Sequence, residues 1–144
     1  YKGIYRPSNP KKYKGDSQNI IYRSLWERKF MNYCDLNENI LEWASEEFWI
    51  PYLDPTTNRV RRYFPDFFIK YKDKDSNIRR SVIEVKPMRE TLEPKATKGK
   101  SRKTMINESM TYVKNQAKWK AAKEFCADRK LEFKIMTEKE LGIR

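Results

Sequence analysis

The spacing of hydrophobic residues predicts a helix near residue 25, followed by three strands. Within SLWERKFMNYC, the residues Trp26, Phe30 and Tyr33 recur at the i, i+4, i+7 spacing of one helical face. Three later apolar stretches are predicted as strands: EEFWIPYLD, RVRRYFPDFFIKY and RRSVIEVK. The turns DPTTN and DKDSN separate them. Pro51 indicates that the first strand either lies at a sheet edge or carries a bulge.

The second half of the chain predicts one long helix and a last strand. The helix runs from about Lys103 to Arg129, and LEFKIMT follows as a short strand before a terminal turn or short helix in EKELGIR. The apolar stripe of the long helix consists of Ile106, Met110, Val113, Ala117, Ala121 and Phe125. The order α-β-β-β-α-β predicts an α/β fold with a mixed sheet flanked by helices.

Two basic segments lack hydrophobic periodicity. Residues 1–20 contain five Lys or Arg and two prolines, which predicts a basic, mostly irregular N-terminal arm, either bound to a partner or simply solvated. Residues 87–103 combine prolines, a glycine and a cluster of Lys and Arg, which predicts a mobile basic loop. At 144 residues, the whole chain, 1–144, is expected to form one domain.

The charge balance favours an anionic partner. The chain has 32 Lys and Arg against 20 Asp and Glu, a formal net charge of +12. Such an excess favours nucleic acid first and an acidic membrane or protein second, with a merely basic soluble protein as the alternative. Neither a signal peptide nor an apolar run of about 18 residues is visible, so no membrane partner is expected.

The absence of histidine narrows the possible chemistry. It excludes Ser-His-Asp and Cys-His catalysis and zinc sites of the Cys/His kind. Cys34 and Cys126 are far apart in the sequence and are expected to be reduced core thiols of a cytosolic protein. The remaining candidates for chemistry are carboxylates, lysines, tyrosines and a hard metal ion.

Charged residues interrupt two of the most apolar segments. If the strands around the Asp73–Asn77 turn form a hairpin in which paired residue numbers sum to 150, Asp66 lies opposite Glu84. Side chains alternate along a strand, so Glu84 and Lys86 point the same way. A register shift of two would keep this face but change the partner of Asp66.

Two close, buried carboxylates are unfavourable unless a cation joins them. Oxygen ligands suit Mg²⁺ or Mn²⁺, which can activate a water, and a nearby lysine can stabilise charge on a phosphate. The pattern of an acid two residues before a lysine occurs five times, but only Glu84/Lys86 and Glu132/Lys134 fall on predicted strands. Only the former has an aspartate on the neighbouring strand. The alternative is a structural ion-pair cluster at a strand end.

The order of elements, with PDFF and IEVK on successive strands, resembles the PD-(D/E)xK nuclease superfamily over about residues 20–136. More narrowly, several segments resemble the head-completion proteins of T-even-type tailed phages: KKYKGD, YRSLWERKF, IPY, RRYFPDFFI, IEVKP and NQAKWKAA. The chain is also similar to the nuclease subunit of cut-and-paste transposition systems. The resemblance implies a restriction-endonuclease-like fold and a role late in phage head assembly, after DNA packaging.

By this resemblance, Glu27 is an upstream helix acid, Asp66 and Glu84 are metal carboxylates, and Lys86 is the catalytic lysine. Glu27 would share the metal, directly or through water. From the residues alone, Ser24 and Glu27 also match a capping box, in which Glu27 reaches back to the N–H of Ser24. Glu46 is a weaker candidate at the start of the first strand.

Several basic residues are candidates for sequence-independent contact with the DNA backbone. They are Lys11, Lys12 and Lys14, then Lys95, Lys98, Lys100, Arg102 and Lys103. Asn115 and Lys118 on the long helix could support the site or touch phosphate, or form a solvated helix face.

The sequence thus predicts a Mg²⁺- or Mn²⁺-dependent DNA endonuclease that acts in phage head completion. Its expected partners are DNA and portal, neck or head proteins, and its expected location is the host cytoplasm during assembly or the virion. The alternatives are a head protein that binds DNA without cleaving it, and a cellular or transposon nuclease.

Overall fold

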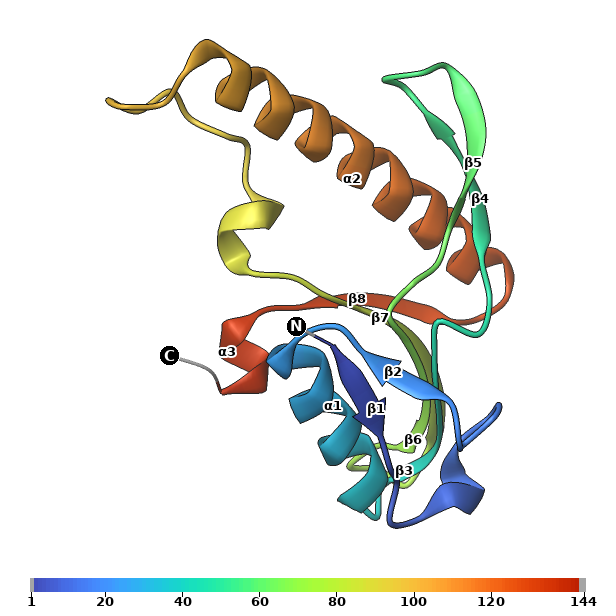
Figure 1. Ribbon diagram of the computed structural model, residues 1–144. Helices are drawn as coiled ribbons and strands as arrows, with labels where there is room; N and C mark the ends of the chain where they lie inside the picture. The colour runs from blue at the N-terminus through green and yellow to red at the C-terminus, as the bar shows by residue number, and fades with distance from the viewer. Residues whose placement is uncertain (1, 143–144) are drawn as a thin grey trace.

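The computed structural model describes residues 2–142 and has a central four-stranded mixed sheet (Figure 1). The sheet order is β3-β6-β7-β8, with β7 and β8 parallel and the other neighbours antiparallel. The strands are β3 (Ile40–Ser45), β6 (Phe67–Lys72), β7 (Ile78–Val85) and β8 (Glu132–Met136). The predicted α/β class with a mixed sheet and flanking helices is confirmed.

Two hydrophobic clusters hold the remaining elements to this sheet. In the first, α1 (Leu25–Leu36) packs Phe30 and Met31 against Trp43 and Phe67 of the sheet. In the second, α2 (Arg102–Asp128) packs against a separate hairpin of β4 (Ile50–Asp54) and β5 (Arg59–Tyr63). A short α3 (Glu138–Leu141) follows β8, as predicted. Residues 143 and 144 of the predicted terminal element lie outside the described residues.

The predicted order α-β-β-β-α-β is confirmed for the four-stranded sheet with α1 and α2, but β4 and β5 are inserted between its first two strands and the first strand was placed wrongly. The first strand of the sheet is β3, whereas the predicted strand EEFWIPYLD contributes β4 to the outer hairpin. A register shift between Ile40 and Glu42 breaks the alternation of β3, so its sequence lacks the period-2 pattern of a strand.

The predicted strand RVRRYFPDFFIKY is in fact two strands, β5 and β6. They are separated by Phe64, Pro65 and Asp66. Pro65 has no N–H to donate to a ladder, which explains why the pairing ends there. Beyond this break the predicted hairpin register is confirmed, because Phe67 pairs with Ile83 and Phe68 with Val82.

The N-terminal segment is folded, not irregular as predicted. Strand β1 (Gly3–Tyr5) pairs with β2 (Ile20–Tyr22), and a 3₁₀ turn (Pro10–Lys12) lies between them. Tyr5, Tyr13 and Ile20 are buried, and the rings of Tyr13 and Trp43 are 4.7 Å apart between centroids. These three buried side chains hold the segment in place, although their spacing in the sequence follows neither a helical nor a strand period. Tyr1 lies outside the described residues.

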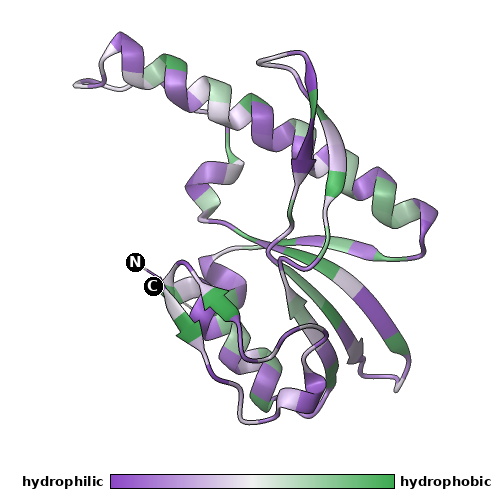
Figure 2. Cartoon of the chain, turned by 45° about the vertical axis from the view of Figure 1, so that its right-hand side comes forward, coloured by the Kyte–Doolittle hydropathy of each residue, from purple (hydrophilic) through white to green (hydrophobic). Residues whose placement is uncertain are grey.

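The long helix α2 is confirmed, but half of its predicted buried stripe is exposed. Ala117, Ala121 and Phe125 pack against the second cluster, whereas Ile106, Met110 and Val113 are exposed. A helix of 27 residues is about 40 Å long, whereas four strands span only about 15 Å. The N-terminal half therefore projects beyond the sheet and carries hydrophobic bands with it (Figure 2).

Part of the predicted loop 87–103 is ordered as a 3₁₀ turn, Met88–Thr91, and the Met88 N–H donates to Glu138 Oε1 at 2.8 Å. The mobility of the rest stays a prediction. Within residues 2–142, no helix combines the length and the apolar character needed to cross a bilayer.

Candidate functional site

Asp66 and Glu84 lie opposite each other where β6 and β7 begin and end, respectively. Asp66 directly precedes β6, and the pairing of Phe67 with Ile83 sets it across from Glu84. The Val85 N–H donates to Asp66 Oδ2 at 2.8 Å, which fixes the carboxylate. The Asp66 carbonyl accepts from the Glu46 N–H at 3.1 Å. The chain thus holds Asp66 from both neighbouring strands.

The two carboxylates differ in burial: Glu84 is buried and Asp66 is half-buried. Glu84 is only 5% exposed, and its Oε1 is buried without a hydrogen-bond partner within residues 2–142. Burial first, and the negative charge of Glu84 second, raise the pKa of Asp66 well above its usual value, although the Val85 N–H opposes the shift. An unpartnered buried acceptor beside a second acid is an arrangement that a cation would stabilise.

Tyr63 lies near Glu84, and Trp119 lies near Tyr63. Burial and the nearby charges of Glu84 and Asp66 raise the pKa of the Tyr63 hydroxyl, which also lies near the Trp119 indole. Neither the Tyr63 hydroxyl nor the Trp119 N–H makes a well-formed hydrogen bond within the described part of the chain. The Tyr63 hydroxyl, the Trp119 N–H and the Glu84 carboxylate thus lie in one region without satisfying one another. They keep hydrogen-bonding capacity for a ligand.

Two lysines supply the positive charge of the site. The Lys86 N–H donates to the Met136 carbonyl at 3.0 Å, which continues the β7–β8 ladder by one residue. Strand alternation then predicts that the Lys86 side chain points to the face of Glu84. Lys118 lies over the rings of Tyr52 and Tyr63, 5.9 and 5.7 Å from their centroids. Burial lowers the pKa of Lys118, Glu84 opposes the shift and Lys86 adds to it.

Glu27 also lies near the site, at the start of α1. Burial raises its pKa, and the charges of Glu46 and Glu84 add to the effect. Ser24 is the N-cap, as predicted, and accepts from the Glu27 N–H at 3.1 Å. The predicted capping box is incomplete, however, because Glu27 Oε1 accepts from the Arg23 N–H at 3.3 Å instead of that of Ser24.

Glu46, the weaker sequence candidate, turns the chain out of β3 with a φ of 52°, which is uncommon for a residue other than glycine. Its carboxylate forms an ion pair with Arg23. Glu46 is therefore neutralised locally, whereas Glu84 is not.

The predicted three-carboxylate metal set is not gathered as a whole. Within residues 2–142, no three acidic, histidine or cysteine side chains come close enough to hold an ion together. The acidic pair Asp66 and Glu84 fits a cation through its unpartnered oxygen and raised pKa. Glu27 lies close enough for its charge to help raise the pKa of Asp66.

The candidate DNA contacts fall into two groups. Lys11 is exposed, but Lys12 donates to the Asp35 and Asn37 carbonyls at 3.0 and 2.9 Å, and Lys14 forms an ion pair with Glu42 at 3.3 Å. The first group thus contributes to the packing of the N-terminal segment. Its contact with DNA stays a prediction.

The second group borders a cleft of about 710 Å³ between α2 and the preceding loop. Lys95 and Lys100 line the cleft with Asn115, and Lys100 pairs with Glu108 at 2.9 Å. Three further candidates are exposed at or near the start of α2: Lys98, Arg102 and Lys103. Asn115 itself is buried, so it is not part of a solvated helix face.

The comparisons with known proteins identify the family of the chain. A sequence model described as the TnsA-like endonuclease N-terminal domain matches residues 37–138. The chain belongs to the TnsA-like endonuclease family. It is also 38% identical over 141 residues to the "Head completion nuclease" of Enterobacteria phage T4, which covers 96% of this chain and 91% of that protein. The resemblances to the head-completion proteins and to the nuclease subunit of transposition systems are thus confirmed.

The matched family region contains Asp66, Glu84 and Lys86 but begins after Glu27. Sequence reasoning did not identify Tyr63 and Trp119 as neighbours of the acidic pair. A signal was available for Tyr63, because it lies three residues before Asp66 on the same segment. Trp119 reaches the site only through the packing of α2 on the β4–β5 hairpin.

Proposed function

We propose that this chain is a divalent-metal-dependent DNA endonuclease of the PD-(D/E)xK type that acts in the completion of a phage head. The observation that carries the proposal is the Asp66–Glu84 pair, in which one carboxylate oxygen of Glu84 is buried and unpartnered. Strand alternation would bring Lys86 to the same face. The family is one of endonucleases, and the T4 relative is named for head completion.

Asp66 and Glu84 would hold a Mg²⁺ or Mn²⁺ ion. When bound, the ion supplies a Lewis acid that lowers the pKa of a water and polarises a phosphate oxygen. The chain supplies the remaining functions. The Val85 N–H keeps Asp66 in place. Lys86 would stabilise negative charge on the attacked phosphate or on the attacking water. Glu27 would orient water near the acidic pair.

The basic residues at and near the cleft would bind the DNA backbone. Lys95, Lys98, Arg102 and Lys103 are exposed there, and Lys100 lines the cleft itself. Backbone contacts of this kind do not depend on base sequence, and binding should weaken steeply as salt rises. Portal, neck or head proteins would be the protein partners. The site of action would be the host cytoplasm during assembly, with the finished head or neck as a second location.

The decisive experiment is cleavage of linear duplex DNA by the purified protein with Mg²⁺, with Mn²⁺ and with EDTA, beside Lys86→Ala. We expect cutting that requires a metal and is lost in the variant, while the variant still folds and binds DNA. Binding without cutting under every metal would contradict the proposal and favour a head protein that only binds DNA. Loss of folding in Lys86→Ala would indicate a structural ion-pair cluster.

A further inference from the structure

The β4–β5 hairpin has two faces of different character. Ile50 pairs with Tyr63 and Tyr52 with Arg61, and Ile50, Tyr52 and Tyr63 are buried against α2. Because side chains alternate along a strand, the intervening positions form the opposite, outer face. The outer face comprises Trp49, Pro51, Leu53, Val60, Arg62 and Phe64.

This outer face is exposed and largely apolar. Trp49 is 44% exposed, Leu53 56%, Val60 72% and Phe64 44%. The Arg62 guanidinium lies over the Trp49 ring, 4.7 Å from its centroid. In Figure 1 the hairpin rises beyond the central sheet beside α2. Folding alone does not account for a row of exposed apolar and aromatic side chains, and such rows mark binding surfaces.

The positive charge of the β4–β5 hairpin indicates which class of partner would bind its outer face. Residues 49–64 contain three arginines and one acid, Asp54. Asp54 is fully buried and forms ion pairs with Arg61 at 3.1 Å and Lys114 at 3.8 Å. Arg59 and Arg62 form no ion pair within residues 2–142. A second copy of this chain, with its own charge of +12, would be repelled, whereas a polyanion would be attracted.

The outer face is also continuous with the candidate site. Strand β5 leads through Phe64 and Pro65 directly to Asp66, so Phe64 is only two residues from the acidic pair. Tyr63 lies between Arg62 and Phe64 in the sequence but points to the inner face. Its hydroxyl lies near the Glu84 carboxylate. A polyanion held on the outer face would therefore lie next to the point where the backbone is cut.

We propose that Trp49, Arg62 and Phe64 hold an unpaired DNA strand beside the cleavage site. Exposed rings can stack on bases only where those bases are not already stacked in a duplex, and arginine adds a contact to base or phosphate. The proposal rests on the endonuclease function proposed above and names its substrate: duplex DNA with a single-stranded end or a locally opened strand.

The test is fluorescence anisotropy in EDTA, with three labelled DNAs: a single strand of thymidines, a blunt duplex, and the same duplex with a thymidine tail. The wild type should bind the tailed duplex more tightly than the blunt one. Trp49→Ala and Phe64→Ala should each weaken binding to the tailed duplex about tenfold, the effect of losing one base–aromatic stack. Trp49→Phe, which keeps a ring, should restore most of the affinity.

Val60→Thr is the matched control, because it changes the most exposed apolar side chain of the same face without removing a ring. It should leave DNA binding unchanged. Equal binding of blunt and tailed duplexes by the wild type, or unchanged affinity in Trp49→Ala, would overturn the inference. Loss of self-association in both Val60→Thr and Trp49→Ala, measured by sedimentation, would overturn it in favour of a protein interface.

These outcomes are separable from those of the proposed function. Binding is read without metal, so a wild type that prefers tailed DNA but never cuts with Mg²⁺ would contradict the endonuclease and leave the strand-binding face supported. A wild type that cuts blunt and tailed duplexes alike, with unchanged rates in Trp49→Ala, would support the endonuclease and contradict the strand-binding face.

Discussion

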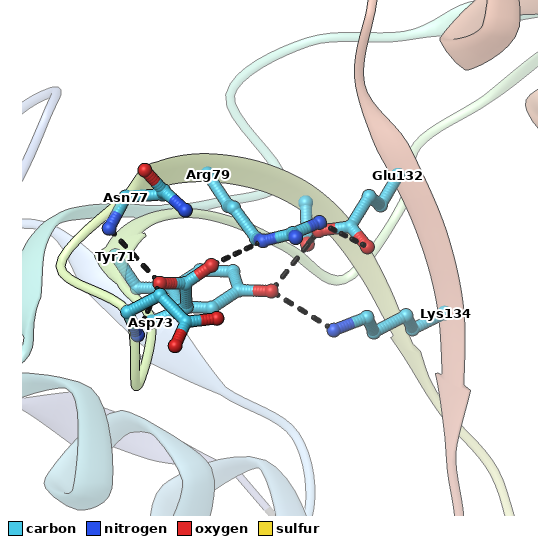
Figure 3. Close-up of polar contacts among 8 residues, drawn as sticks. Tyr71, Asp73, Asn77, Arg79, Glu132 and Lys134 are labelled. Carbon is cyan, nitrogen blue, oxygen red and sulfur yellow. Dashed lines mark hydrogen bonds and ion pairs between the residues drawn. The ribbon is translucent and has the colours of Figure 1, made fainter.

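Acidic residues lie at both ends of the β6–β7 hairpin, and they differ in whether their carboxylates have hydrogen-bond or ion-pair partners. At the turn end, Asp73 accepts from the Arg79 guanidinium at 2.6 Å, and Glu132 accepts from the Tyr71 hydroxyl at 3.0 Å (Figure 3). Lys134 in turn donates to Tyr71 at 3.1 Å. At the other end, Asp66 and Glu84 face each other, and one carboxylate oxygen of Glu84 has no partner in residues 2–142.

The contrast is sharpest between the two strand-borne pairs of glutamate and lysine. Glu84/Lys86 on β7 and Glu132/Lys134 on β8 share the same spacing on neighbouring parallel strands. The β8 pair is tied into a network by Tyr71, which links Lys134 to Glu132. The difference shows that spacing does not define a reactive site: the unsatisfied pair has capacity for a ligand, and the satisfied pair serves stability.

The largest expected effect comes from removing one charge at each end. Glu84→Gln should lower cleavage on the order of a thousandfold or more, because an amide is a poor substitute for a carboxylate that holds a divalent ion. Glu132→Gln should cleave at nearly the wild-type rate. The measurement is single-turnover cleavage of duplex DNA in Mg²⁺. Similar losses in the two variants would mean that the network in Figure 3 also takes part in catalysis.

The two lysines give the next effect. Lys86→Ala should lower cleavage about a hundredfold or more, because a charge near the attacked phosphate is lost. Lys134→Ala removes only a contact to Tyr71 and should leave cleavage intact. Anisotropy measurements should show that both variants still bind DNA. If Lys134→Ala were as inactive as Lys86→Ala, the assignment of the lysine would be wrong.

The register of the site could be predicted from the sequence because both strands are apolar and their turn is short. In β6, Phe67 and Ile69 are buried whereas Phe68 and Lys70 are only half-buried, so a slip of one residue would move the buried side chains to the less buried face. This preference fixes Asp66 opposite Glu84. The face of Lys86 is a prediction from strand alternation alone. These are local consequences of burial on one hairpin.

The remaining features depend on contacts between distant segments. Strand β3 could not be identified because the irregularity after Ile40 disrupts its alternation. The N-terminal segment was predicted as irregular, since its anchors, such as Tyr13 against Trp43, have no period. Trp119 joins the site only because β4 and β5 pack on α2. The N-terminal half of the apolar stripe of α2 was wrongly expected to be buried, because the spacing of apolar residues does not reveal how much of a helix the sheet covers.

A smaller effect should appear in the pH dependence of stability. Asp66 has a pKa above its ordinary value of 3.8, so the folded chain binds more protons than the unfolded chain above that pH. Its contribution to stability therefore falls as pH rises from 3.8 through the folded-state pKa. Asp73 has a lowered pKa, chiefly through Arg79, so its contribution is present above 3.8 and is lost as pH falls through the folded-state pKa.

At neutral pH in EDTA, Asp66→Asn should therefore be more stable than the wild type, and Asp73→Asn less stable. The measurement is urea unfolding at several values from about pH 4 to 8. Added Mg²⁺ should stabilise the wild type and not Asp66→Asn. A lower stability of Asp66→Asn at neutral pH would show that the acidic pair is a structural element and would remove the contrast between the two ends.

The smallest effect should follow from Tyr71→Phe, which deletes a single hydroxyl at the turn end. That hydroxyl donates to Glu132 and accepts from Lys134. Its loss should lower the free energy of unfolding by about 1 kcal/mol, the usual contribution of one or two partly exposed hydrogen bonds, without altering cleavage.

Tyr63→Phe is the matched change at the other end, where the hydroxyl makes no well-formed bond within residues 2–142. Tyr63→Phe should leave stability unchanged or raise it, because a buried, unsatisfied group is removed. The reverse order of stabilities would mean that the Tyr63 hydroxyl is a structural partner of Glu84, and the acidic end would then be more satisfied than its geometry indicates.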